Sequence, residues 1–157
     1  FRVTSMLKCT TFFLTAALAA LSVAHAEDGL AIYNSRCSVC HQAAGIGSPS
    51  QFPPLSGRIG KIAGSPEGKA YLIHVLLNGL HGPLEASDVS YMGYMPSFKS
   101  LSDEDLAAVL TYVSSLNTPG TPPVFSAGDF RSQRDTPKKA KDILAEREAL
   151  DVLHPLP

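Results

Sequence analysis

The chain has 157 residues and a formal net charge of −1 at pH 7, with histidine counted as neutral. Residues 27–118 carry five basic and eight acidic side chains, a net charge of −3, which speaks against nucleic acid as a partner because phosphate binding needs a basic surface. About 131 residues follow a predicted leader over 1–26, enough for one small domain.

Residues 1–26 have the features of a secretory signal peptide. Lys8 gives a basic start, Thr10 to Val23 is largely apolar, and Ala24-His25-Ala26 is a small-x-small cleavage pattern. We predict export to a bacterial periplasm and cleavage near Ala26, with Met6 as the expected start. An uncleaved anchor is the alternative, but a run of about 14 residues is short for a bilayer. We therefore expect no stable membrane span after cleavage.

Cys37-Ser38-Val39-Cys40-His41 carries the most chemical information in the chain. In an exported protein, C-x-x-C-H is typical of covalent c-type haem attachment. Two thiols at this spacing can bond to the two vinyl groups on one haem edge, and the imidazole that follows can reach the iron. We predict one haem c, with its iron, attached through Cys37 and Cys40 and bound by His41.

Three other uses of these cysteines remain open. A disulfide suits an oxidising compartment, but it gives His41 no role. A thioredoxin-like redox pair needs a preceding strand and a βαβ pattern, and a structural zinc site needs four ligands. The sequence shows no βαβ pattern and no second C-x-x-C or H-x-x-x-H, so these three uses are less favoured than haem attachment.

The periodicity of apolar residues predicts an all-α fold, with helices near 28–41, 66–78 and 102–116. Ser65 and Ser102 are the expected N-caps of the second and third helices. Glycine, serine and proline are frequent over 45–64 and 80–100, so we predict that both stretches are mostly loop. No alternating strand pattern is found.

We predict a domain over 27–118 and a helical C-terminal extension over 119–157. Thr136-Pro137 is the expected start of its helix, which carries a narrow stripe formed by Ala140, Ile143, Leu144, Arg147 and Leu150. Two interpretations stay open: the extension folds back on the domain, which we favour slightly, or the stripe docks a dehydrogenase subunit.

From Gly29 to about Leu116 the chain resembles the class I cytochrome c family. Gly29 and Tyr33 precede the first motif cysteine by eight and four residues. In the family, a glycine and an aromatic residue at these places let the first helix cross the last one closely, here at Tyr112 and Leu116. The resemblance implies a small cytochrome c fold of three or more helices around one covalently bound haem.

Pro53-x-Leu55-x-Gly57 looks like the family's loop after the haem motif. There, the proline carbonyl holds the ring nitrogen of the haem histidine that does not bind iron. The resemblance therefore implies that Pro53 and Leu55 lie at the cofactor. Arg58 could neutralise a haem propionate, or it could be a solvated surface side chain, and both interpretations stay open.

Met95-Pro96 looks like the family's distal ligand segment, with Met92 as the alternative. A thioether is a soft, neutral ligand, so His/Met ligation raises the reduction potential. Core filling is the usual structural role of methionine, but Met95 lies in a segment punctuated by glycine and proline. His74 and His81 are rival ligands that would give bis-histidine ligation.

The resemblance implies single-electron transfer rather than enzyme catalysis. The order of Phe52-Pro-Pro-Leu-Ser-Gly57, Asn78-Gly79 and Met95-Pro-Ser-Phe98 looks closest to small cytochromes, and cytochrome subunits, that serve periplasmic dehydrogenases. The expected donor is such a dehydrogenase, and the expected acceptor is a terminal oxidase or another cytochrome. A permanent subunit of a dehydrogenase complex and a ligand-binding haem sensor are the alternatives.

Overall fold

The computed structural model describes residues 28–157, so the predicted signal peptide lies outside the described residues. A helix over 28–36 is followed by a turn at Cys37 and, in chain order, by α2 (Ser38–His41), the 3-10 turn η1 (Ala43–Gly45), α3 (Ile59–Ile62), α4 (Pro66–Asn78), β1 (Leu80–Ala86), β2 (Val89–Met95), α5 (Asp103–Ser115), α6 (Ala127–Arg134) and α7 (Ala140–Leu153). The predicted helical class is confirmed. None of the helices within 28–157 has the length and apolar character that a membrane span requires.

The two central helices begin where their N-caps predict. The Ser65 hydroxyl accepts a hydrogen bond from the backbone N–H of Gly68 at 3.0 Å, and Pro66 occupies the first turn of α4. The Ser102 hydroxyl accepts from the N–H of Asp105 at 3.0 Å, and three acidic residues fill the first turn of α5. Local capping chemistry therefore sets the start of both helices.

The first helix crosses α5 at Gly29. A Cβ atom added at Gly29 would collide with the carbonyl oxygen of Ala108 and would lie 2.8 Å from the Cβ of Tyr112. The rings of Tyr33 and Tyr112 lie 5.5 Å apart between centroids, and Tyr33 is fully buried. The predicted crossing at Tyr112 is confirmed. Leu116 lies against Gly45 at the end of η1.

Residues 80–95 form an antiparallel β-hairpin, so the prediction of loop is wrong for this stretch. A two-residue turn joins the strands, and Ser87 and Asp88 have φ of 51° and 60°. Both values fit a primed hairpin turn. The usual sequence signal for such a turn is Asn-Gly or Asp-Gly, and Ser-Asp is not one of the usual pairs. Gly82 and Pro83 also lower the strand propensity of β1, which is why the sequence pattern misses it.

The extension consists of two helices, α6 and α7, where one was predicted. A capping box starts α6, because Ser126 and Asp129 each accept a hydrogen bond from the other's backbone N–H. The second helix, α7, begins at Ala140 rather than at Thr136. Its N-cap is Lys139, whose N–H donates to the Asp142 carboxylate at 3.1 Å.

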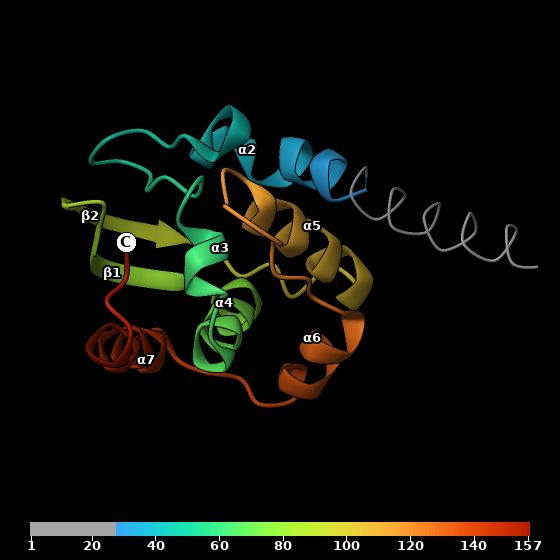
Figure 1. The fold of residues 1–157 in the computed structure, drawn as a ribbon. Coiled ribbons are helices and arrows are strands. Elements are labelled where there is room, and N and C mark those ends of the chain that lie inside the picture. Colours follow the sequence, from blue (N-terminus) through green and yellow to red (C-terminus); the bar gives the residue numbers. More distant parts are fainter. Residues whose placement is uncertain (1–27) are drawn as a thin grey trace, which may run out of the picture.

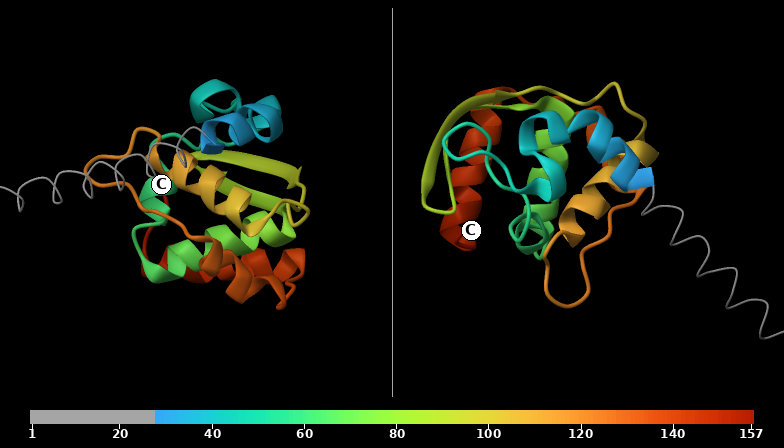
Figure 2. Two further views of the ribbon diagram at one scale, coloured as in Figure 1. Left: turned by 90° about the vertical axis from the view of Figure 1, so that its right-hand side faces the viewer. Right: turned by 90° about the horizontal axis from the view of Figure 1, so that it is seen from above.

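The extension folds back on the rest of the protein. In Figure 1, α7 lies against β1 and α4, and α6 lies against α5. Figure 2 shows the hairpin and α7 on one side of the molecule and the first helix and α5 on the other. Ile143 and Leu150 are buried, so most of the apolar stripe packs internally. The interpretation of a folded-back extension is therefore confirmed, and the stripe is not a free docking surface.

One core joins the central helices to the extension. Its members come from the first helix, α3, α4, β1, α5, the loop before α6, and both helices of the extension. They include Ile62, Tyr71, Leu72, Leu76, Leu106, Val109, Val113, Phe125, Phe130, Ile143 and Leu150. Residues after 118 therefore supply part of the core that supports the site described next.

Candidate haem site

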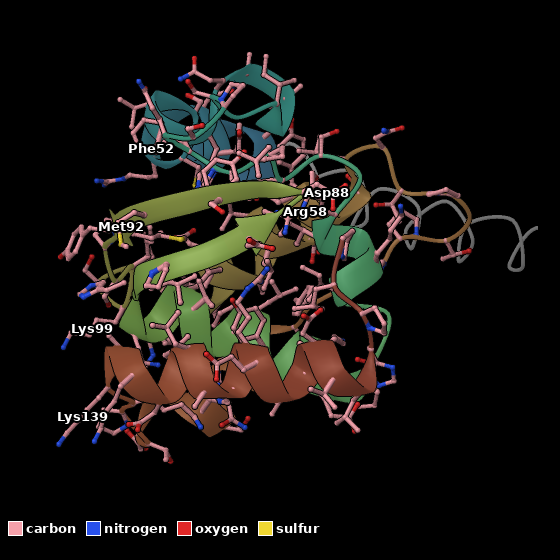
Figure 3. The ribbon with its side chains drawn as sticks, turned by 90° about the vertical axis from the view of Figure 1, so that its left-hand side faces the viewer. Phe52, Arg58, Asp88, Met92, Lys99 and Lys139 are labelled. Atoms are coloured by element: carbon pink, nitrogen blue, oxygen red, sulfur yellow. The ribbon has the colours of Figure 1, made fainter. Side chains whose placement is uncertain are left out.

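A cavity of about 570 Å³ lies between the C-x-x-C-H segment and the hairpin. This volume is in the usual range for a cofactor pocket. Its walls are mostly apolar, and its lining includes Cys37, Cys40, His41, Phe52, Pro53, Leu80, Leu84, Tyr91, Met92, Met95, Pro96 and Phe98. Figure 3 shows Phe52 above the hairpin and Met92 on it, away from Asp88 in the turn. The fold thus brings the C-x-x-C-H segment and the segment that carries Met95 to one cavity.

His41 ends α2 and is 8% exposed. Its Nδ1 lies 2.9 Å from the carbonyl oxygen of Pro53, so the predicted hydrogen bond is confirmed. A carbonyl only accepts, so Nδ1 carries the proton and donates, which leaves the lone pair on Nε2 for a metal. Burial lowers the pKa of His41, and the nearby charge of Arg58 adds to this shift. The neutral imidazole needed for iron binding is therefore favoured.

Cys37 and Cys40 are both free cysteines, half-buried at the wall of the cavity. The backbone turns at Cys37, and the N–H groups of Cys40 and His41 both donate to the Cys37 carbonyl, at 3.1 and 2.9 Å. This tight turn presents the two thiols and the imidazole to the same space. Burial, with a contribution from Cys40, raises the pKa of Cys37 to about 11, so its sulfur is a neutral thiol at pH 7.

The hairpin distinguishes the two methionines. Alternate residues of a strand point to opposite faces, so Tyr91 and Met95 share one face and Met92 lies on the other. Tyr91 is buried and Met95 is half-buried, whereas Met92 is 74% exposed. An added Cβ at Gly93, which lies between Tyr91 and Met95 on their shared face, would meet no atom within 4 Å. Both methionines line the cavity, but the greater burial of Met95 favours it over Met92 as the thioether available to a metal.

The two rival histidines do not line the cavity. His74 is buried on α4, where Nδ1 lies 2.7 Å from Oε1 of Glu146 and Nε2 lies 3.1 Å from Oε1 of Gln133. Both ring nitrogens are therefore engaged by the extension. His81 lies in β1, and its ring stacks on Tyr94 with the centroids 4.3 Å apart. Neither imidazole is placed to bind a metal in this cavity.

Leu55 lies in the same loop as Pro53 and Arg58 directly follows that loop, and neither residue lines the cavity. Arg58 is 6% exposed, so the interpretation of a solvated side chain is wrong. Its guanidinium donates to the carbonyl oxygens of Pro54 and Pro157, both at 2.7 Å. Burial lowers the pKa of Arg58 to about 10, with a further contribution from Arg147, and it remains a cation at neutral pH.

Sequence reasoning missed several residues that complete this region. Leu80, Leu84 and Tyr91 form the hairpin wall of the cavity, and their sparse spacing along the two strands gives too weak a local signal to predict it. Arg147 approaches Arg58 from α7, and no local pattern could pair residues so far apart in sequence.

Replacing Arg58 with leucine is expected to lower the free energy of unfolding by about 2 kcal/mol, because two carbonyl groups lose a charged donor. Lys61→Leu is the matched control, since Lys61 is an exposed cation on the next helix. Urea unfolding followed by circular dichroism measures both. Equal losses in the two variants would contradict the structural role of Arg58.

The residues of the cavity fit a covalently attached haem. One wall offers two thiols and an oriented neutral imidazole, and the hairpin wall offers a thioether. Imidazole and thioether are an established axial pair for haem iron, and the apolar lining suits the porphyrin ring. These features come from residues 37–98 together and not from the C-x-x-C-H segment alone.

Comparison with known proteins agrees with this interpretation. The family model described as cytochrome c matches residues 26–117. A cytochrome c-552 of Thermus thermophilus is 39% identical over 138 residues, which cover 85% of this chain and 91% of that protein. The cytochrome c subunit of alcohol dehydrogenase (quinone) from Gluconacetobacter polyoxogenes is 30% identical over 113 residues, which cover 69% of this chain and 22% of that subunit.

The predicted family and cofactor are confirmed. The family implies a covalently attached haem c with its iron, and electron transfer rather than enzyme catalysis. The match over most of the chain and the motif in its cavity point to the same conclusion: the chain belongs to the cytochrome c family.

Proposed function

We propose that this protein is a periplasmic single-electron carrier whose haem iron is bound by His41 and Met95. The observation that supports this proposal best is that Cys37, Cys40, His41 and Met95 line one cavity. The hydrogen bond from His41 to Pro53 adds to it, because the imidazole is already oriented.

Each residue has a separate role in this proposal. The S–H groups of Cys37 and Cys40 would add across the C=C bonds of the two vinyl groups, which gives two thioether bonds and leaves no by-product. Pro53 and Leu55 would hold the loop that orients His41, and Arg58 would brace the same loop as a buried cation through the Pro54 carbonyl. The haem supplies reversible one-electron chemistry when bound.

The second protein ligand would set which oxidation state of the iron is favoured. Met95 offers a neutral thioether, which favours ferrous over ferric iron and so raises the reduction potential. With the imidazole and the thioether both bound, the iron would have no free position for a substrate. The walls of the cavity are mostly apolar, which suits the porphyrin ring. This arrangement suits electron transfer, because the same ligands would serve both oxidation states of the iron.

The proposed context is the bacterial periplasm, after cleavage of a signal peptide near Ala26. In this proposal residues 27–118 form the haem domain and 119–157 its extension. The donor would be a periplasmic dehydrogenase, and the acceptor a terminal oxidase or another cytochrome. A permanent place in a dehydrogenase complex is the second candidate, because one relative is a subunit of alcohol dehydrogenase (quinone). Stable co-purification with a larger subunit would favour this second candidate.

The His/Met proposal is tested by the visible and near-infrared spectra of the holoprotein in both oxidation states. The oxidised wild type is expected to show the weak red charge-transfer band of sulfur ligation. Met95→Ala is expected to lose this band and to bind carbon monoxide when reduced, because one iron position becomes open. The matched control is Met92→Ala, which removes an exposed methionine from the same strand and is expected to keep the band. A wild type without the band, or loss only in Met92→Ala, would overturn the proposed ligation.

A further inference from the structure

The segment from 96 to 102 connects Met95 to α5 and has no regular secondary structure. It is attached on one side to the end of α4. The hydroxyl of Ser97 donates to the Leu77 carbonyl at 2.6 Å, and the N–H of Phe98 donates to the Leu76 carbonyl at 2.8 Å. These two bonds fix the residues that immediately follow the proposed ligand.

Arg134, near the end of α6, holds the other side of the same segment. Its Nη1 donates to the Lys99 carbonyl at 2.6 Å, and its Nη2 donates to the Leu101 carbonyl at 3.0 Å. Its Nε donates to the carboxylate of Asp103, the first residue of α5, at 2.8 Å. Every nitrogen of the guanidinium thus bonds to residues 99–103.

The environment of this contact makes it stronger than an ordinary surface ion pair. The side chain of Arg134 is 30% exposed and that of Asp103 is 14% exposed, so solvent only partly screens their charges. A planar guanidinium fixes the directions of its hydrogen bonds, which a lysine ammonium cannot do. The last turn of α6 also favours a cation there. Arg134 therefore fixes the position of the segment through directed hydrogen bonds, and does more than supply a positive charge beside it.

We propose that Arg134 is a positioning residue for the sixth iron ligand. By holding residues 99–103 against α6, it keeps the segment after Met95 in the place where the thioether reaches the iron. The extension, which lies beyond the residues matched by the family model, thereby controls how firmly the sixth position is closed. The inference rests on the proposed His/Met ligation and adds a residue of the extension to that site.

The test uses the full-length holoprotein with Arg134→Gln, which removes the fork of charged donors. Carbon monoxide binding to the reduced protein, the charge-transfer band of the oxidised protein and the reduction potential are measured well below the onset of unfolding. Arg134→Gln is expected to bind carbon monoxide about tenfold faster than wild type, because the loss of charged hydrogen bonds lets the segment move. Its band is expected to weaken, and its potential to fall.

Arg131→Gln is the matched control. It removes the same charge from the same helix, but Arg131 is 67% exposed and contacts only the side chains of Asp103 and Glu104, at 3.7 and 3.5 Å. We expect its rate of carbon monoxide binding to stay within about twofold of wild type. Arg134→Lys keeps the charge without the planar fork and is expected to give an intermediate rate. It replaces Arg134→Gln if the latter does not fold.

Three results would separate a positioning role of Arg134 from a structural role, from a charge effect and from a different iron ligand. If Arg134→Gln melts earlier but keeps the wild-type band, potential and carbon monoxide rate, Arg134 has only a structural role and the inference is overturned. Equal changes in Arg131→Gln would also overturn it, because they would assign the effect to charge alone. A wild type that lacks the sulfur band would instead refute the proposed His/Met ligation itself.

Discussion

Replacing Cys37 and Cys40 together with alanine is expected to abolish covalent haem attachment completely. Each of the two thioether bonds needs one of these sulfur atoms. The two half-buried thiols line the cavity on the side of His41. Coordination by His41 and Met95 alone would hold haem only reversibly. A denaturing gel stained for haem, with the intact mass of the purified protein, measures the attachment directly.

Val39→Ala is the matched control for this prediction. Val39 lies between the two cysteines and is 77% exposed, and although it touches the cavity, shortening it to alanine keeps both thiols and the imidazole. We expect this variant to carry one haem per chain, as the wild type does. Haem that stays with the double cysteine variant through a denaturing gel would refute attachment at these two sulfur atoms.

Gly29→Val is expected to have the largest effect on stability, a loss of about 3 kcal/mol in the free energy of unfolding. The reason is steric, because the space for a side chain at Gly29 is already filled by the Ala108 carbonyl and by Tyr112 on α5. The first helix would have to move away from α5 and take the neighbouring haem motif with it. Chemical denaturation of the holoprotein measures the loss.

The control for this crossing is Gly128→Ala on α6. A Cβ at Gly128 would meet only the Ser126 hydroxyl, at an ordinary 3.6 Å, and the residue is exposed. Alanine favours a helix over glycine, so we expect stability to be unchanged or to rise by up to about 1 kcal/mol. An equally small change in the free energy of unfolding for Gly29→Val would contradict the close crossing of the first helix and α5.

The features predicted from sequence are those with local causes. Serine caps and the first-turn proline define α4 and α5, because an N-cap needs only residues within one helical turn. The C-x-x-C-H spacing indicates the haem and the first iron ligand for the same reason, since all three reactive groups lie within five residues. The predicted bond from His41 to Pro53 depended on the family resemblance.

Features formed by distant residues needed the tertiary structure. The hairpin at 80–95 has a turn without the usual sequence signal, and only its pleat places Met95 and Met92 on opposite faces. Arg58 donates one of its hydrogen bonds to Pro157, which is 99 positions away.

By itself the sequence determined the cofactor, its attachment, the helical class and the starts of α4 and α5. Only the tertiary structure decided which methionine is the more buried, what surrounds Arg58, and how the extension supports the site. Arg134 illustrates the reason: its side chain reaches the segment after Met95 only because α6 packs beside α5. Such contacts follow from the packing of whole elements, which local sequence patterns do not encode.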